Sequence, residues 1–122
     1  MLTLAVIGIA AHAATETSWT YQSYDVRSGD KAVPGYITLN ENGGAATLHI
    51  MAGNMNRCFS RDLNVTVERT ADKTIIVAEP FLMGCDKLRY TLKNDGTGGT
   101  REVWAVDKWE LDPKDRVLTL RK

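Results

Sequence analysis

Histidine and cysteine, the residues that most often build catalytic and metal centres, are scarce in this chain of 122 residues. There are two histidines, His12 and His49, and two cysteines, Cys58 and Cys85. A Ser/His/Asp or Cys/His site would have to be built on His49, because His12 falls in a leader segment that we expect to be removed. One histidine and two cysteines also fall short of the usual zinc ligand set. We therefore expect a protein that is not an enzyme and needs no cofactor.

The chain has no excess of charge of either sign. Its 15 basic and 15 acidic residues give a formal net charge of zero. Such a chain lacks the positive field that supports nucleic-acid binding. It also lacks the polybasic cluster that holds proteins to anionic lipid. The balance predicts no nucleic-acid partner and no stable membrane anchor.

Charged residues are absent from positions 1–13, which read as a secretory signal peptide. An apolar run covers residues 2–11, and Ala11-His12-Ala13 forms a small-x-small cleavage motif. The run is shorter than the roughly 20 residues that cross a bilayer. We expect cleavage after Ala13, a single domain over residues 14–122, and a periplasmic or secreted location.

The two cysteines fit an oxidising compartment. An even pair in a small exported domain usually forms a bridge, here Cys58–Cys85. Closing their separation would stabilise the fold by roughly 3–4 kcal/mol in the chain-entropy model. A pair of reactive thiols is the alternative, although the spacing is not that of a CxxC motif.

Beyond residue 13, no segment keeps a helical apolar period, and turn residues separate short β-branched or aromatic runs. This rhythm predicts an all-β fold, a small antiparallel meander of seven to eight strands. We expect it to form a closed or partly open barrel, with a two-sheet sandwich as the alternative. A change of apolar face in the first run predicts a bulge near Gln22–Ser23. These seven to eight strands are drawn from nine candidate segments, residues 19–26, 36–40, 45–51, 64–70, 74–78, 87–93, 101–107 and 116–121 and a short one near 57–59.

In shape, such a domain resembles the small exported β-barrels that inhibit lysozymes. The resemblance lies in a signal peptide, a short mature chain, a meander and one disulfide. The chain does not contain the short Ser-Gly and Tyr motifs of the c-type lysozyme inhibitors. The resemblance therefore concerns architecture, which does not by itself fix a function.

Tryptophans close to a glycine-rich loop are the candidate binding residues. Residues 103–106 are apolar at every position, so both faces of that strand need cover, and Trp109 follows closely. Tryptophan is enriched at binding hot spots. The preceding Asp-Gly-Thr-Gly-Gly loop adds Asp95 and Thr97. We expect a non-enzymatic extracytoplasmic binding module, such as an inhibitor or immunity-type protein, that binds a protein partner through loops or a sheet edge.

Two alternatives remain open. His49, Met51, Met55 and Met83 are the residue types that bind copper, and they resemble the His/Met sites of small periplasmic copper-binding β-barrels. If the disulfide forms, it draws Met55 and Met83 towards each other. The other alternative is a lipocalin-like carrier of a small ligand, which needs a hollow barrel.

Overall fold

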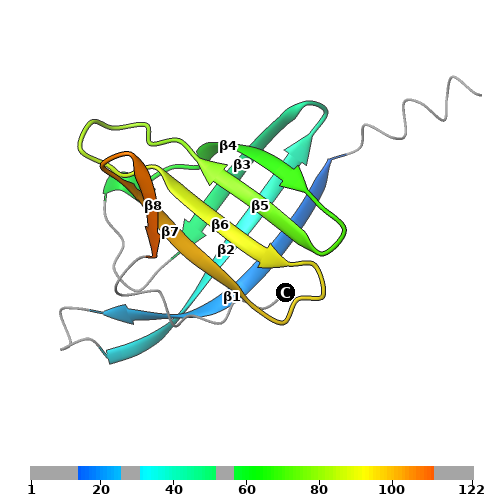
Figure 1. Ribbon diagram of the computed structural model, residues 1–122, viewed down its shortest axis with the longest axis horizontal. Helices are drawn as coiled ribbons and strands as arrows, with labels where there is room; N and C mark the ends of the chain where they lie inside the picture. The colour runs from blue at the N-terminus through cyan, green and yellow to red at the C-terminus, as the bar shows by residue number, and fades with distance from the viewer. Residues whose placement is uncertain (1–13, 26–30, 52–56, 112–122) are drawn as a thin grey trace, which may run out of the picture.

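The computed structural model describes residues 14–25, 31–51 and 57–111, which form eight strands and one short 3-10 helix (Figure 1). Each strand pairs antiparallel with the next one in sequence, so the predicted all-β meander is confirmed. The signal peptide at 1–13, the turn at 112–115 and the strand at 116–121 lie outside the described residues. The elements are β1 (Thr15–Asp25), β2 (Lys31–Asn42), β3 (Ala45–Met51), η2 (Arg57–Phe59), β4 (Leu63–Arg69), β5 (Lys73–Ala78), β6 (Leu88–Lys93), β7 (Gly99–Ala105) and β8 (Lys108–Leu111).

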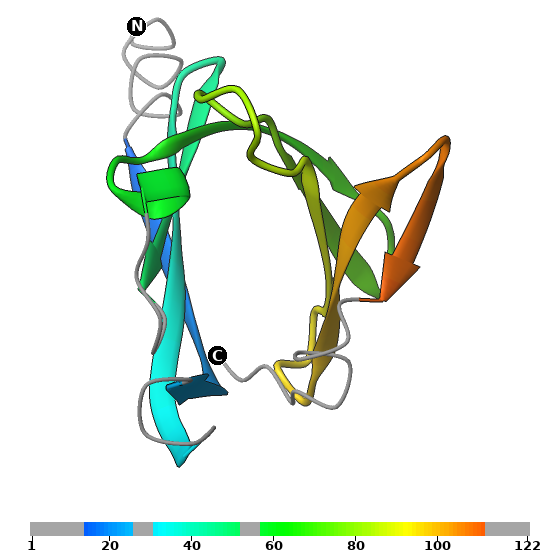
Figure 2. The same cartoon turned by 90° about the vertical axis from the view of Figure 1, so that its left-hand side faces the viewer.

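The eight strands form one curled sheet that is not closed. In the described part of the chain, β1 and β8 are its two edges and do not pair with each other. The strands β1–β3 stand opposite β5–β8, and β4 crosses between the two halves (Figure 2). The outcome is the partly open barrel, rather than a closed barrel or two separate sheets.

Strand β4 makes the bend because it changes partner along its length. Its first residues, Leu63 and Asn64, pair with Leu48 and Thr47 of β3. From Val65 onward it pairs with β5 instead. The two halves of the sheet are therefore joined by only two residue pairs between β3 and β4.

Alternating side chains from both halves build one core. Along β6, Leu88, Tyr90 and Leu92 are buried, whereas the residues between them face outward. Ile37 and Leu39 of β2 are also buried, as the sequence predicted. Burying an aliphatic side chain of this size contributes about 1.5–3 kcal/mol, so these positions stabilise the curled shape. The other core members are Trp19, Tyr21, Leu48, Ile50, Leu63, Ile76 and Ala78.

Three sequence expectations about local structure are wrong. No bulge occurs at Gln22–Ser23, because β1 and β2 pair without interruption along all of β1. Residues 57–59 form the 3-10 helix η2 in the connection between β3 and β4, where no neighbouring strand pairs with them. The strand predicted over 101–107 ends at Ala105, because Val106 and Asp107 form a turn and β8 begins at Lys108.

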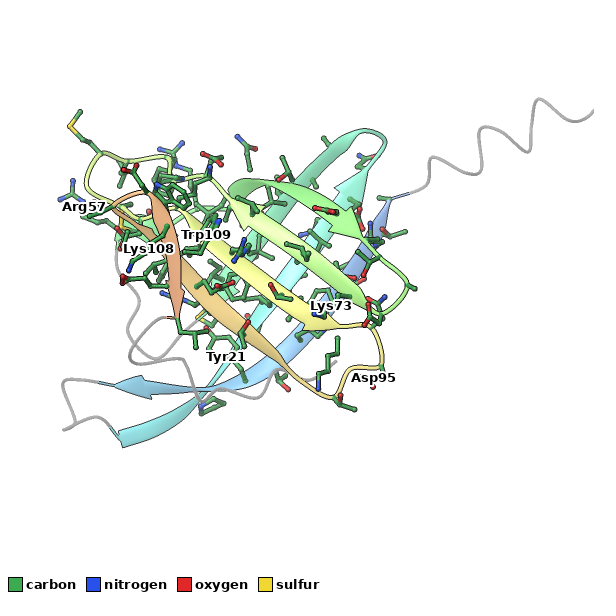
Figure 3. The ribbon with its side chains drawn as sticks, in the orientation of Figure 1. Tyr21, Arg57, Lys73, Asp95, Lys108 and Trp109 are labelled. Carbon is green, nitrogen blue, oxygen red and sulfur yellow. A yellow bond between two sulfur atoms is a disulfide. The ribbon has the colours of Figure 1, made fainter. Side chains whose placement is uncertain are left out.

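Because every strand reverses direction, successive connections alternate between two ends of the sheet. What we call the disulfide end carries η2, the 79–87 loop and the Val106-Asp107 turn. What we call the hairpin end carries the connections at 43–44, 70–72 and 94–98. Figure 3 shows Arg57 and Lys108 at the disulfide end and Lys73 and Asp95 at the hairpin end.

Candidate functional site

A cluster of aromatic and charged side chains lies on the outer face of β6, β7 and β8. Trp104 and Trp109 are direct cross-strand partners, and their rings meet edge to face with centroids 5.1 Å apart. The Arg89 guanidinium lies 4.6 Å from the centre of the Trp109 ring. It also donates two hydrogen bonds to Glu102, Nε to Oε1 at 2.8 Å and Nη2 to Oε2 at 3.0 Å. We call these four residues the tryptophan cluster.

The strand register explains why these four side chains meet. Arg89 is directly opposite Glu102, and its neighbours Leu88 and Tyr90 face the core. Along β7, Val103 packs against the core, so Trp104 must face outward. A two-residue turn then returns the chain so that Trp109 stands beside Trp104. The bidentate ion pair and the cation–π contact hold the cluster in a defined shape.

That turn has an unusual backbone for its residues. Val106 and Asp107 have φ angles of 42° and 69°, the pattern of a type I′ turn. Such turns favour Asn and Gly, and a β-branched residue at positive φ is a strained exception. Val106 is 91% exposed, so packing does not explain why valine occupies this position.

Exposed apolar area is concentrated on the β7–β8 hairpin. Besides Val106, Trp104 is 41% exposed and Leu111 is 48% exposed. Among the residues whose side chains the structure describes, 14–21, 34–51 and 57–111, the other exposed large hydrophobic residues are Tyr36 on β2 and Met83 in the 79–87 loop. Single exposed apolar residues are ordinary, but several on one short hairpin indicate a contact surface.

The other two predicted binding residues do not join this cluster. Asp95 accepts hydrogen bonds from the Thr97 hydroxyl at 2.6 Å and the Thr97 backbone N–H at 2.9 Å. These two bonds lower the pKa of the exposed Asp95 carboxyl, the hydroxyl bond contributing most. The loop lies at the hairpin end, before Gly99, whereas Trp104 lies near the end of β7. The strand between Gly99 and Trp104 is about 17 Å long.

The predicted metal ligands are also dispersed. His49 and Met51 share the outer face of β3, and the His49 ring is bonded through Nδ1 to Asp62 Oδ1 at 2.9 Å. Met83 is 101% exposed, which leaves its side chain without contact to either residue. Met55 lies outside the described residues. Among the residues that are described, no group of three or more His, Cys, Asp or Glu side chains could hold a metal. Copper binding stays a prediction.

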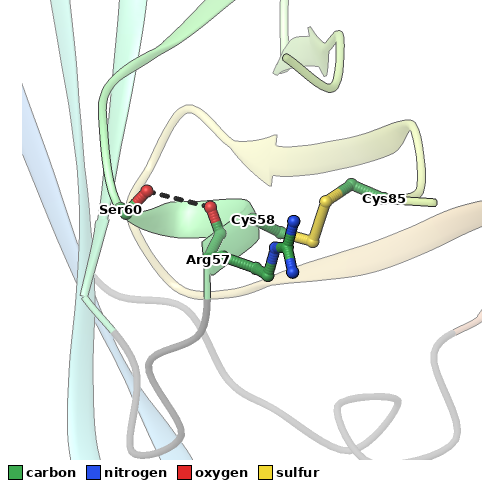
Figure 4. The surroundings of a disulfide bond; sticks show 4 residues. All are labelled: Arg57, Cys58, Ser60 and Cys85. Carbon is green, nitrogen blue, oxygen red and sulfur yellow. Dashed lines mark hydrogen bonds between the residues drawn. A yellow bond between two sulfur atoms is a disulfide. The ribbon is translucent and has the colours of Figure 1, made fainter. Parts of the chain in front are cut away.

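The predicted disulfide is present, at the disulfide end of the sheet. Cys58 of η2 is bonded to Cys85 of the 79–87 loop, with 5.7 Å between their Cα atoms (Figure 4). The Ser60 hydroxyl donates to the Arg57 carbonyl oxygen at 2.9 Å and closes the turn of η2. A disulfide is consistent with an extracytoplasmic, oxidising location.

Two hollows lie at the opposite, hairpin end. One of about 140 Å³ is lined by Thr17, Trp19, Arg69, Thr74, Lys93 and Asn94. A wider one of about 430 Å³ opens beside the start of β1 and the turn at 43–44. In the smaller hollow, the Thr74 hydroxyl donates to the Asn94 side-chain oxygen at 2.7 Å, so these two polar groups already satisfy each other. The two hollows offer no catalytic constellation.

Sequence reasoning missed Arg89, Glu102 and the strand β8. The signal for β8 was present, because Trp109 and Leu111 alternate with Lys108 and Glu110 in the period of a strand. The turn before it contains neither Gly nor Asn, so no ordinary turn signal separates β8 from β7 in the sequence.

No protein-family model, curated protein or solved structure matches this chain. In the parts of the chain that the structure describes, no helix is long and apolar enough to cross a membrane.

Proposed function

We propose that this protein is a non-enzymatic extracytoplasmic module that binds another protein through the outer face of its β7–β8 hairpin. The observation that carries the proposal is the concentration of exposed apolar side chains on that hairpin, next to the tryptophan cluster. The partner remains to be identified, and an inhibitor or immunity-type role is compatible with this mode of binding. The predicted signal peptide is the basis for the proposed periplasmic or secreted location, and the disulfide is consistent with it.

The chemistry of the cluster suits protein recognition. Trp and Arg dominate interface hot spots because they bury a large area at fixed geometry. Arg89 is already held by Glu102 and Trp109, so it loses little rotamer freedom on binding. The exposed Val106 and Leu111 extend the apolar area to both ends of the hairpin.

The test begins with identification of a partner by affinity capture from an extracytoplasmic extract, followed by binding measurements with purified components. We expect Trp104→Ala and Trp109→Ala each to weaken binding at least about tenfold, as hot-spot residues do. Tyr36→Ala is the matched control, because Tyr36 is 38% exposed and lies on β2, in the other half of the sheet. Near-ultraviolet circular dichroism checks that each variant is folded.

Unchanged affinity in both tryptophan variants would contradict the proposal that the hairpin is the interface. A loss of affinity in Tyr36→Ala as large as that in the tryptophan variants would contradict it as well. Thr97→Ala tests the remaining predicted residue. Because the 94–98 loop lies at the opposite end of β7, we expect Thr97→Ala to leave binding unchanged.

A further inference from the structure

We propose that Met83 is a methionine-oxidation site that reacts in the folded protein, and that its conversion to the sulfoxide alters the surface without unfolding the domain. The first observation is exposure: Met83 is 101% exposed, more than any other large hydrophobic residue whose side chain the structure describes. Nothing in the fold packs against its thioether. This inference stands independently of the proposed function.

The other sulfur-containing side chains that the structure describes are less available to an oxidant than Met83. Both cysteines are joined in the disulfide, so the chain has no free thiol to react first. The other described thioether belongs to Met51, which is half-buried on β3. The Met51 backbone is also held, because the Tyr21 hydroxyl donates to its carbonyl oxygen at 3.3 Å. Oxidation follows exposure, so Met83 should react before Met51.

The loop geometry explains how Met83 remains presented to solvent. Cys85 N–H donates to the Leu82 carbonyl oxygen at 3.3 Å, and Gly84 has a φ of 88°. This is the pattern of a type II turn, which needs Gly at the position after Met83. The turn therefore points Met83 outward, away from the disulfide that follows.

Several contacts that do not involve Met83 anchor the loop. Arg61 lies 4.3 Å from the centre of the Phe81 ring, and Lys87 forms an ion pair with Glu79 at 3.4 Å. The Lys87 carbonyl oxygen accepts a hydrogen bond from Trp104 N–H at 2.9 Å. With the disulfide, these contacts hold the loop whatever the chemical state of the thioether.

The reaction needs an external oxidant, for which hydrogen peroxide serves as the probe. The Met83 sulfur attacks one peroxide oxygen, the O–O bond breaks, and the products are the sulfoxide and water. The sulfur is oxidised and the peroxide is reduced. The side chain thereby changes from apolar to polar.

The experiment treats the folded full-length chain with hydrogen peroxide and follows oxygen uptake by peptide mass analysis after disulfide reduction. Trypsin releases residues 74–87, in which Met83 is the single methionine, and residues 32–57, in which fragment ions separate Met51 from Met55. We expect the 74–87 peptide to gain one oxygen several-fold faster than Met51. Circular dichroism and the melting temperature should stay unchanged at full Met83 oxidation.

Two variants sharpen the test. Met83→Leu should abolish the uptake in residues 74–87, whereas the matched variant Met51→Leu should leave it unchanged. Oxidation of Met51 as fast as Met83 in the folded chain would overturn the proposal. A clear fall in melting temperature that tracks Met83 oxidation would overturn it as well.

Discussion

The two ends of the sheet are built on different principles. At the hairpin end, residues suited to turns satisfy one another through hydrogen bonds, as Asn94 does with Thr74 and with the carbonyls of Thr70 and Ala71. At the disulfide end, a covalent bond holds the connections, a valine adopts a strained turn conformation, and Met83 and Val106 project into solvent. The hairpin end thus carries turns whose polar groups bond to one another, and the disulfide end presents exposed apolar side chains.

The two ends differ in how closely their turns follow ordinary turn chemistry. The hairpin end follows ordinary turn chemistry, for example Gly43 and Gly96 at φ angles of 68° and 80°. A local rule broken without a gain in packing, as at Val106, indicates a functional demand. This difference supports the proposal of a binding surface on the β7–β8 hairpin over one on the Asp95–Thr97 loop.

Among the variants that test this comparison of the two ends, removal of the disulfide should lower the free energy of unfolding the most. The double variant Cys58→Ser, Cys85→Ser opens a loop of 27 residues and should lower the free energy of unfolding by about 3–4 kcal/mol. Urea unfolding measures the loss, and a reductant should weaken the native protein but not the variant. Equal stabilities would mean that the non-covalent contacts suffice to hold the disulfide end.

Asn94→Ala is the corresponding test of the hairpin end. It removes the acceptor of the buried Thr74 hydroxyl and the donors to two loop carbonyls, so we expect a loss of about 1–3 kcal/mol. Asn94→Asp is the matched control, because it keeps the acceptor and should cost less. If urea unfolding finds the two variants equal, the bond to Thr74 is not the stabilising contact.

Val106→Asn should stabilise the protein, by about 1 kcal/mol, because asparagine tolerates positive φ better than a β-branched residue does. No packing is lost, since the side chain is exposed. Met83→Asn is the control, equally exposed but without positive φ, and should leave the melting temperature unchanged. A destabilised Val106→Asn would show that the valine contributes to the fold.

The smallest effect concerns Asp95 and pH. Its pKa is lowered from the ordinary 3.8 by bonds from Thr97, so its contribution is complete above 3.8 and is lost as pH falls through the lower folded value. Asp95→Asn should melt slightly below wild type at neutral pH, and this difference should vanish in acid. A difference that persists in acid would contradict the role of the carboxylate.

The sequence was a good guide where a local rule operates. Alternation predicted the core of β6, and the glycine-rich turns predicted the hairpins at 43–44 and 94–98, because such turns need particular residues. Local rules could not place Arg89 opposite Glu102, since that contact depends on the register between strands. The sequence prediction also grouped Thr97 with Trp104 in one binding site because they are close in sequence. In the structure the extended strand between them keeps them apart.

The change of partner in β4 has a consequence for how the molecule opens. Two residue pairs join the halves of the sheet, whereas β1 and β2 share eleven. Amide hydrogens at the β3–β4 junction should therefore exchange with solvent before those inside either half, through local opening rather than global unfolding. The disulfide ties η2, next to this junction, to the second half. It therefore links the two halves beside the junction where few strand pairs join them, and its reduction should speed amide exchange at that junction while the shared core holds both halves together.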